Sequence, residues 1–203
     1  MNPQEKSETL KEHEKEPGLS YNEEAATLLL DIYPDQKTFS WLKTRAAKEG
    51  LFEKNEFHVT VIGRETGEII LAKLDELAPE EKERALKDIN RLSSQFTWSF
   101  SQKPEYYYIS KDYPSGEDTS ETEERKSYIQ ITDLPDLTEF YKELNSMLGL
   151  SLEIPFSHIT LFTTSTLEKN KLRGIGIYSE SQFKNLNPQK IDPDRGGSEG
   201  FEL

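Results

Sequence analysis

Two segments of this chain carry the same order of apolar and periodic stretches. In the first, an apolar run at 28–33 is followed by Pro34 and Asp35, a stretch at 38–50 with apolar residues at helical spacing, and an apolar run at 57–63. Short apolar runs bounded by turn residues are typical of strands, and a period near 3.6 residues is typical of an amphipathic helix. The segment therefore predicts strand, helix, strand.

The second segment repeats these landmarks about 100 residues later. An apolar run at 128–132 precedes Pro135 and Asp136, a helical stretch at 137–149 and an apolar run at 155–162. A proline stops a strand, an aspartate suits the start of a helix, and the glycine that closes each helical stretch suits the turn after it. We therefore predict an α+β fold built from two similar lobes.

Further elements lie outside this repeat. The segment 80–94 places its apolar residues on one side of a predicted helix. Runs rich in aromatic and β-branched residues predict strands, and a polar acidic stretch predicts a loop. The predicted strands are at 96–101, 105–112 and 174–181, and the loop is at 112–126.

The two ends are too polar to join a hydrophobic core. Only 33% of the residues are hydrophobic, and charged, Pro and Gly residues dominate both ends. Such segments cannot bury enough apolar surface to offset the entropy lost on ordering. We predict a disordered charged tail at 1–20, a single bilobed domain at 21–186 and a flexible tail at 187–203.

The overall composition excludes several classes of protein. The net charge of −13 disfavours binding to duplex DNA, which requires a basic face. There is no cysteine, which excludes disulfides and thiolate metal sites, and there is no apolar run long enough to span a membrane. We expect a cytoplasmic monomer that has no membrane or duplex-DNA partner.

The repeat carries its chemistry in two His-x-Thr strands. His58 and Thr60 lie two residues apart, as do His158 and Thr160. Side chains two apart on a strand share a face, so each strand presents an imidazole and a hydroxyl together. Cleavage of a phosphodiester needs a base and an acid, which imidazoles can supply near neutral pH, and hydroxyls can donate to the phosphate oxygens.

Two other interpretations of these histidines are weaker. Each could be a satisfied core histidine, but this does not explain why both stand at equivalent repeat positions with Thr at +2. A zinc site normally takes three or four His, Cys or carboxylate ligands, and here the +2 partner is Thr and cysteine is absent. We predict a site that uses no metal and no cofactor.

The paired motifs HVTV at 58–61 and HITL at 158–161 resemble those of the two-histidine (2H) phosphoesterases. This superfamily includes LigT-like RNA cyclic phosphodiesterases, plant cyclic nucleotide phosphodiesterases and phage enzymes that degrade cyclic oligonucleotide signals. The resemblance covers roughly residues 24–182. It implies a bilobed, pseudo-two-fold α+β fold, with two antiparallel sheets facing a central cleft and helices outside. It also implies that the two motif histidines and the two motif threonines are catalytic.

These observations lead to three functional hypotheses. The first is hydrolysis of the 2′,3′-cyclic phosphate of a nucleotide or short RNA end. The second is cleavage of cyclic di- or oligonucleotide signals, and the third is nucleotide binding without turnover. The candidates for substrate contacts are Arg64, Tyr108, Lys111 and Tyr178.

Overall fold

The computed structural model describes residues 18–114 and 122–192. Most of the predicted tails, at 1–17 and 193–203, and the centre of the predicted acidic loop, at 115–121, lie outside the described residues. The histidine at position 13 lies outside them as well.

Within the described ranges the chain forms an α+β fold with five α-helices and eight strands, all belonging to one antiparallel sheet. The strands and helices follow one another in the order β1 Leu19–Asn22, β2 Thr27–Asp31, α1 Gln36–Lys48, β3 Phe52–Glu53, β4 His58–Ile62, α2 Arg64–Leu74, α3 Pro79–Ser93, β5 Ser101–Pro114, β6 Thr122–Asp133, α4 Asp136–Leu148, β7 His158–Ser165, the 3-10 turn η1 Glu168–Asn170, α5 Glu180–Asn185 and β8 Gln189–Ile191.

The predicted strand–helix–strand repeat is confirmed. The first unit is β2–α1–β4 and the second is β6–α4–β7. Asp35 caps α1 by accepting a hydrogen bond from the Thr38 N–H at 2.9 Å, whereas α4 begins without a side-chain cap. Gly149 ends α4 with a φ of 62°, a left-handed conformation that glycine adopts without strain.

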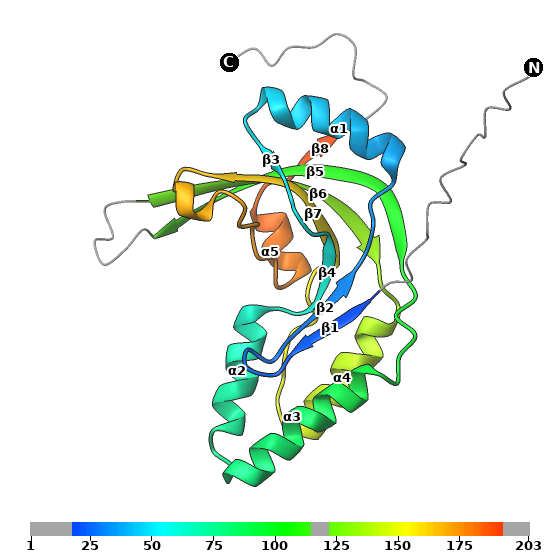
Figure 1. Cartoon of the computed structure of the whole chain (residues 1–203), viewed down its shortest axis with the longest axis vertical. Coiled ribbons are helices and arrows are strands. Elements are labelled where there is room, and N and C mark those ends of the chain that lie inside the picture. The colour runs from blue at the N-terminus through cyan, green and yellow to red at the C-terminus, as the bar shows by residue number, and fades with distance from the viewer. Residues whose placement is uncertain (1–17, 115–121, 193–203) are drawn as a thin grey trace, which may run out of the picture.

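The expectation of two separate sheets is not confirmed. The strands run in the order β1-β2-β4-β7-β6-β5-β8, with β3 paired to β7, and they form one strongly curved sheet (Figure 1). The N-terminal strands join the C-terminal strands through β4 and β7, which pair at Val59 and Ile159. The two halves of the repeat therefore share a continuous sheet.

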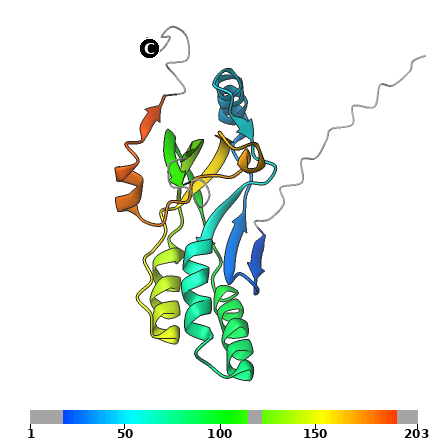
Figure 2. The same cartoon turned by 90° about the vertical axis from the view of Figure 1, so that its left-hand side faces the viewer.

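One face of this sheet carries the main hydrophobic core. Side chains from β2, β4 and β7 pack there against the apolar faces of α1, α2, α3 and α4. In the side view α1 lies at one end of the molecule and the other three helices stand together at the opposite end (Figure 2). On the opposite face a smaller cluster packs α5 against β5 and β6, with Ile109, Ile129 and Phe183 at its centre.

Two predicted strands are wrong. Residues 96–100 form no strand, because Trp98 takes a φ of 53° and its indole N–H donates to the Ser93 carbonyl at 2.8 Å. This turn buries the ring beside Phe140 instead of extending the chain. Residues 174–178 are irregular, and α5 begins at Glu180 inside the segment predicted as the late strand.

The predicted loop and C-terminal tail are shorter than expected. Strand β5 continues to Pro114 and β6 starts at Thr122, so both ends of the predicted loop at 112–126 belong to a long hairpin. Strand β8 lies within the predicted tail and pairs with Tyr106–Tyr108, because Ile191 is buried in the core. Sequence patterns also did not predict β1, α2 or α5.

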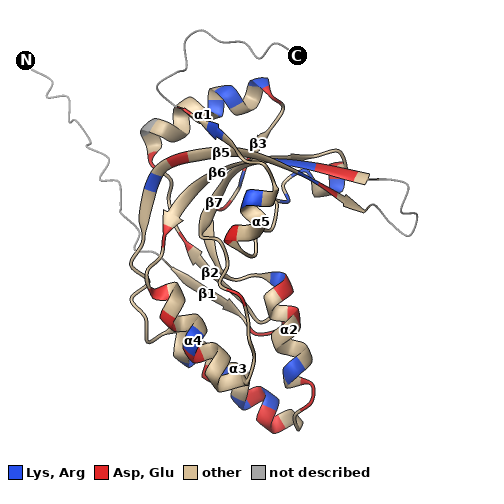
Figure 3. Ribbon diagram, turned by 180° about the vertical axis from the view of Figure 1, so that it is seen from behind, with Lys and Arg blue, Asp and Glu red and all other residues tan. Residues whose placement is uncertain are grey.

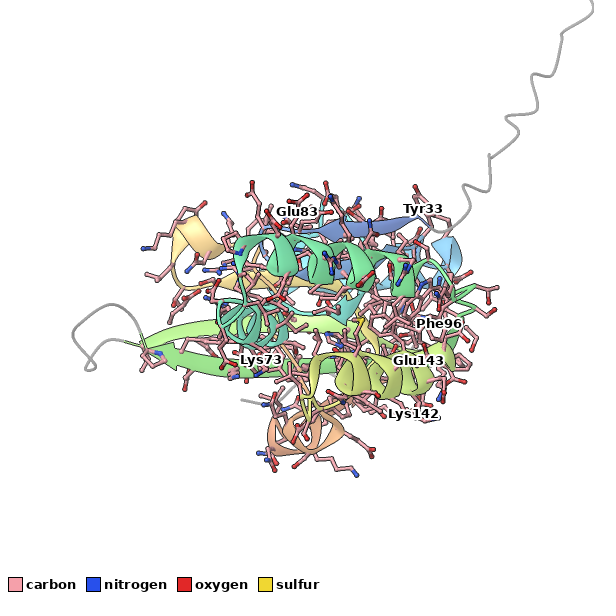
Figure 4. The ribbon with its side chains drawn as sticks, turned by 90° about the horizontal axis from the view of Figure 1, so that it is seen from below. Tyr33, Lys73, Glu83, Phe96, Lys142 and Glu143 are labelled. Carbon is pink, nitrogen blue, oxygen red and sulfur yellow. The ribbon has the colours of Figure 1, made fainter. Side chains whose placement is uncertain are left out.

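Charged residues are distributed over the helices. Figure 3 shows both basic and acidic residues along α2, α3 and α4, whereas the charged residues within α1 are all basic. Seen from below, Lys73, Glu83 and Lys142 come from α2, α3 and α4, three helices that lie beside one another (Figure 4). Among the helices that the structure describes, none is both long and apolar enough to cross a bilayer.

Candidate active site

The first motif lies on β4, where alternate side chains face opposite sides of the sheet. Val59 and Val61 are 0% exposed and belong to the main core. His58 and Thr60 are partly exposed and lie on the opposite face. The predicted division of the strand into an apolar face and an imidazole–hydroxyl face is therefore confirmed.

The second motif repeats this arrangement on β7. Ile159 and Leu161 are buried in the core, and His158 and Thr160 are partly exposed on the other face. On the neighbouring strand β6, Ile129 is the partner of Thr160, so this face continues into the smaller cluster that packs against α5.

Pairing of β4 with β7 brings the two motifs together. Because the strands are antiparallel and Val59 is the partner of Ile159, the step from Val59 to His58 corresponds to the step from Ile159 to Thr160. Each histidine therefore lies beside the threonine of the other motif. All four motif side chains line one cavity.

The cavity has a volume of about 190 Å³. Its floor is the polar face of β4 and β7, and one wall is the irregular segment 174–178 that follows η1. The residues that line it besides the four motif residues are Lys54, Glu56, Gly63, Arg64, Pro155, Gly174, Ile175, Gly176, Ile177 and Tyr178.

Two glycines of the 174–178 wall make close contacts, Gly174 with a motif side chain and Gly176 with Tyr178 of the wall itself. A Cβ on Gly174 would lie 3.2 Å from the Thr160 hydroxyl oxygen, and a Cβ on Gly176 would overlap the Tyr178 hydroxyl. A larger residue at position 174 would push the wall away from Thr160, and one at position 176 would displace the Tyr178 side chain. Ile175 and Ile177 alternate with the glycines and anchor the wall in the smaller cluster.

His158 is held in one orientation. Its Nδ1 lies 2.8 Å from the Phe156 carbonyl oxygen. A carbonyl only accepts hydrogen bonds, so Nδ1 carries the proton of the neutral ring and Nε2 keeps a free lone pair. Burial lowers the pKa of His158 below its ordinary 6.5, the Phe156 carbonyl opposes this, and His58 adds a smaller lowering. This histidine is therefore poised to accept a proton.

His58 has more charged neighbours. Burial lowers its pKa below 6.5, and the Lys54 ammonium lowers it further. The carboxylates of Asp31 and Glu56 oppose these effects and favour the protonated ring. Asp31 is the cross-strand partner of His58 on β2, so its charge lies next to the ring.

Two of the four candidates for substrate contacts line the cavity. Arg64 is exposed at the first residue of α2, directly after β4. Tyr178 is partly buried, and burial together with the Glu65 carboxylate raises the pKa of its hydroxyl well above the usual range. Both were named from the sequence, and both can reach a ligand in the cavity.

The other two candidates are not among the described residues that line the cavity. Tyr108 faces the main core, where its ring packs edge-on against Tyr128 with the ring centres 6.0 Å apart. Its place on β5 points it to the wrong side of the sheet for substrate contact. Lys111 lies farther along β5, with Nζ 4.9 Å from the centre of the Tyr113 ring.

Sequence reasoning missed Lys54 and Glu56 as cavity residues. Both lie between β3 and β4, a short connection with no recognisable motif. Their closeness in sequence to His58 was the only available signal.

Within residues 18–114 and 122–192, no group of three or more His, Cys, Asp or Glu side chains is placed to hold a metal ion. Comparisons of this chain with protein-family models, with curated proteins and with solved structures find no match.

Proposed function

We propose that this chain is a phosphodiesterase of the two-histidine type, which hydrolyses the 2′,3′-cyclic phosphate of a nucleotide or a short RNA end. The observation that carries the proposal is the lining of one cavity by His58, Thr60, His158 and Thr160. We further propose that the two strand–helix–strand units are the lobes of a two-histidine phosphoesterase fold, related by an approximate two-fold axis near the Val59–Ile159 pair.

In the proposed reaction His158 is the base. Its free Nε2 removes a proton from a water molecule, and the water oxygen attacks phosphorus on the side opposite the leaving ribose oxygen. The contact between Nδ1 and Phe156 supports this role, because it fixes the tautomer that leaves Nε2 able to accept.

His58 is the acid. The protonated ring donates its proton to the ribose oxygen as the bond from phosphorus to that oxygen breaks. The product is a nucleoside monophosphate. The proton that His158 gained is later lost to solvent and His58 takes up a proton from solvent, which restores both rings. Asp31 and Glu56 support the assignment, since their negative charges favour a protonated ring at this position, and among the described residues no carboxylate acts on His158 in the same way.

The threonines stabilise the charge that develops on phosphorus. Thr60 and Thr160 each place a hydroxyl beside the histidine of the opposite strand, where it can donate to a non-bridging phosphate oxygen. Arg64 and Tyr178, at the edge of the same cavity, are placed to contact the nucleoside part of the substrate. This chemistry requires no metal, because two imidazoles supply the base and the acid.

A substrate panel with product identification tests the proposal. The purified protein is incubated with the four 2′,3′-cyclic mononucleotides, with a short RNA that ends in a cyclic phosphate, and with 3′,5′-linked cyclic di- and oligonucleotides. We expect the 2′,3′-cyclic compounds to be opened to monophosphates. Cleavage of the 3′,5′-linked compounds alone would favour the signal-degrading hypothesis, in which a ribose hydroxyl replaces water as the nucleophile.

The control is the double variant His58→Ala/His158→Ala. If the native protein shows no more activity than this variant on any compound of the panel, the catalytic proposal is wrong. Retained nucleotide binding under those conditions would favour a binding module without turnover.

A further inference from the structure

Lys54 is the cavity residue whose role the proposed reaction leaves open. Its backbone N–H donates to the Leu161 carbonyl at 3.1 Å, which attaches this part of the chain to β7. Its ammonium Nζ donates to the Leu172 carbonyl at 2.7 Å, close to the start of the 174–178 wall. The side chain therefore reaches from the connection before β4 to the segment after η1, across the cavity edge.

The ammonium group retains donors for a ligand. A lysine ammonium has three N–H donors, and the carbonyl of Leu172 takes one of them. No ion pair of Lys54 occurs among the residues that the structure describes. Burial lowers the pKa of Lys54, and the nearby Glu56 carboxylate opposes this.

Lys43 shows how different Lys54 is from a surface lysine. Lys43 is on α1, its side chain is 61% exposed, and Nζ lies 2.6 Å from the carboxylate of Glu53. That cation is already neutralised and is solvated. Lys54, one residue beyond Glu53, is partly buried and lines the cavity, and within residues 18–114 and 122–192 its ammonium donates to a neutral carbonyl and forms no ion pair.

We propose that Lys54 is a phosphate-binding residue of this cavity and that its remaining N–H donors bind the anionic phosphoryl group of the ligand. The identification of that ligand as a nucleotide phosphodiester rests on the proposed function, whereas the anion site does not. A partly buried cation that has no carboxylate partner among the described residues is suited to this, because it need not lose such an ion pair when the phosphate binds.

The proposal has a consequence for His58. The titratable groups that act on this ring are Lys54 and Glu56 from the connection before β4, Asp31 from β2 and His158 from β7. Lys54 disfavours a charged ring while the cavity is free of anions. A bound phosphate offsets that effect, so the pKa of His58 rises and the protein takes up a proton as the ligand binds. The acid would thus be charged when the substrate is present.

Binding measurements test the proposal without depending on turnover. Inorganic phosphate and adenosine 2′-monophosphate are titrated by calorimetry into the native protein, Lys54→Met, Lys54→Arg and the matched control Lys43→Met. We expect Lys54→Met to weaken binding of both probes about tenfold or more, as for a lost charge-assisted hydrogen bond. Lys54→Arg should retain part of the affinity, and Lys43→Met should bind as the native protein does.

Glu56→Gln should change the affinity for the two probes in the opposite direction. It removes the one carboxylate among the described cavity-lining residues, so both probes should bind more tightly. The histidine resonances, followed by NMR against pH, should give a higher pKa for His58 in free Lys54→Met than in the free native protein. In the native protein that pKa should rise when phosphate is added.

The proposal is overturned if Lys54→Met is folded by circular dichroism and binds both probes as tightly as the native protein. It is also overturned if the native protein binds neither probe. If Lys54→Met does not fold, the affinities of Lys54→Arg and Glu56→Gln for the two probes decide whether the proposal holds. Lys54-dependent binding without hydrolysis of any panel compound would reject the proposed function alone, and hydrolysis with Lys54-independent binding would reject this inference alone.

Discussion

Val59 and Ile159 are partners across the antiparallel strands β4 and β7, and both are 0% exposed. This buried pair holds the two halves of the sheet together. Because side chains alternate along a strand, burying these two residues directs the flanking histidines and threonines to the opposite face. The core thereby positions the polar site, although it contributes no polar group.

Replacing either motif histidine should remove most activity. We expect His58→Ala or His158→Ala to lower kcat on a 2′,3′-cyclic nucleotide on the order of 10²–10⁴-fold, the usual effect of losing a general acid or base. The thermal unfolding midpoint should change little, since neither histidine belongs to the buried core. The remaining histidine provides the control: His13→Ala should keep full activity.

A substrate with a good leaving group separates the roles of the two histidines. A nitrophenyl ester departs without protonation, so His58→Ala should lose much less activity on a nitrophenyl phosphodiester than on a cyclic nucleotide. His158→Ala should lose activity on both substrates, because the attacking water still needs a base. The reverse pattern would exchange the assigned roles.

The threonine hydroxyls should contribute through the transition state. Thr60→Val and Thr160→Val keep the shape of the side chain but remove the donor, and we expect each to lower kcat roughly 10²-fold. Thr60→Ser and Thr160→Ser retain a hydroxyl and should retain most of the activity. Steady-state kinetics on one 2′,3′-cyclic nucleotide makes the comparison, and equal loss in the Val and Ser variants would contradict it.

The pH profile of kcat/KM should be bell-shaped and centred on the acidic side. In the protein without substrate, burial is the main reason why the pKa of both histidines lies below 6.5. Activity falls as the pH drops through the pKa of the base, and it falls again as the pH rises through the pKa of the acid. Both limbs should therefore lie below pH 6.5. A plateau that extends from pH 7 to 9 would show that the two histidines do not titrate as proposed.

Removal of divalent metals should leave activity unchanged. The proposed base, acid and phosphate contacts are all side chains of this chain, so treatment with EDTA followed by gel filtration should not change kcat. The same preparation assayed with added Mg²⁺ or Mn²⁺ should show no gain. A loss with EDTA that either metal restores would refute the metal-independent reaction.

Glu123 should stabilise the fold near the start of β6, where it pairs with Tyr113 of β5. Its carboxylate accepts hydrogen bonds from Arg125 Nε at 2.6 Å and Nη2 at 2.8 Å, and further ones from Ser165 and Asn170. These contacts, the Arg125 bonds first, lower the pKa of Glu123 to about 2 although burial opposes them. A lowered pKa means that this stability is present above the ordinary 4.5 and is lost as the pH falls from there towards 2.

Glu123→Gln should therefore lower the free energy of unfolding at pH 7 on the order of 3 kcal/mol, because it leaves a buried Arg125 without its charge partner. Urea denaturation at pH 7 and at pH 3 measures this, and the difference between native protein and variant should shrink at the lower pH. The matched control is Glu53→Gln, which removes the exposed pair with Lys43 and should cost less than about 1 kcal/mol.

The local features of the fold were predictable from residue patterns. Helical spacing identified α1, α3 and α4, and alternation identified β4 and β7 and the face on which each His-x-Thr pair lies. These features depend on neighbours within a few positions, so sequence spacing reports them directly. The predicted strand at 96–101 failed where Trp98, a strand-favouring residue, turns into the core.

Amino-acid patterns were thus sufficient for the repeat, for the two imidazole–hydroxyl pairs and for the sidedness of their strands. The joining of those strands at Val59 and Ile159, the irregular wall with its two glycines and the entry of Lys54 into the cavity were decided only by the folded chain. They depend on contacts between residues far apart in sequence, which form because burying both halves of the sheet in one core is favourable. No local spacing encodes which distant partner a strand or a lysine will meet.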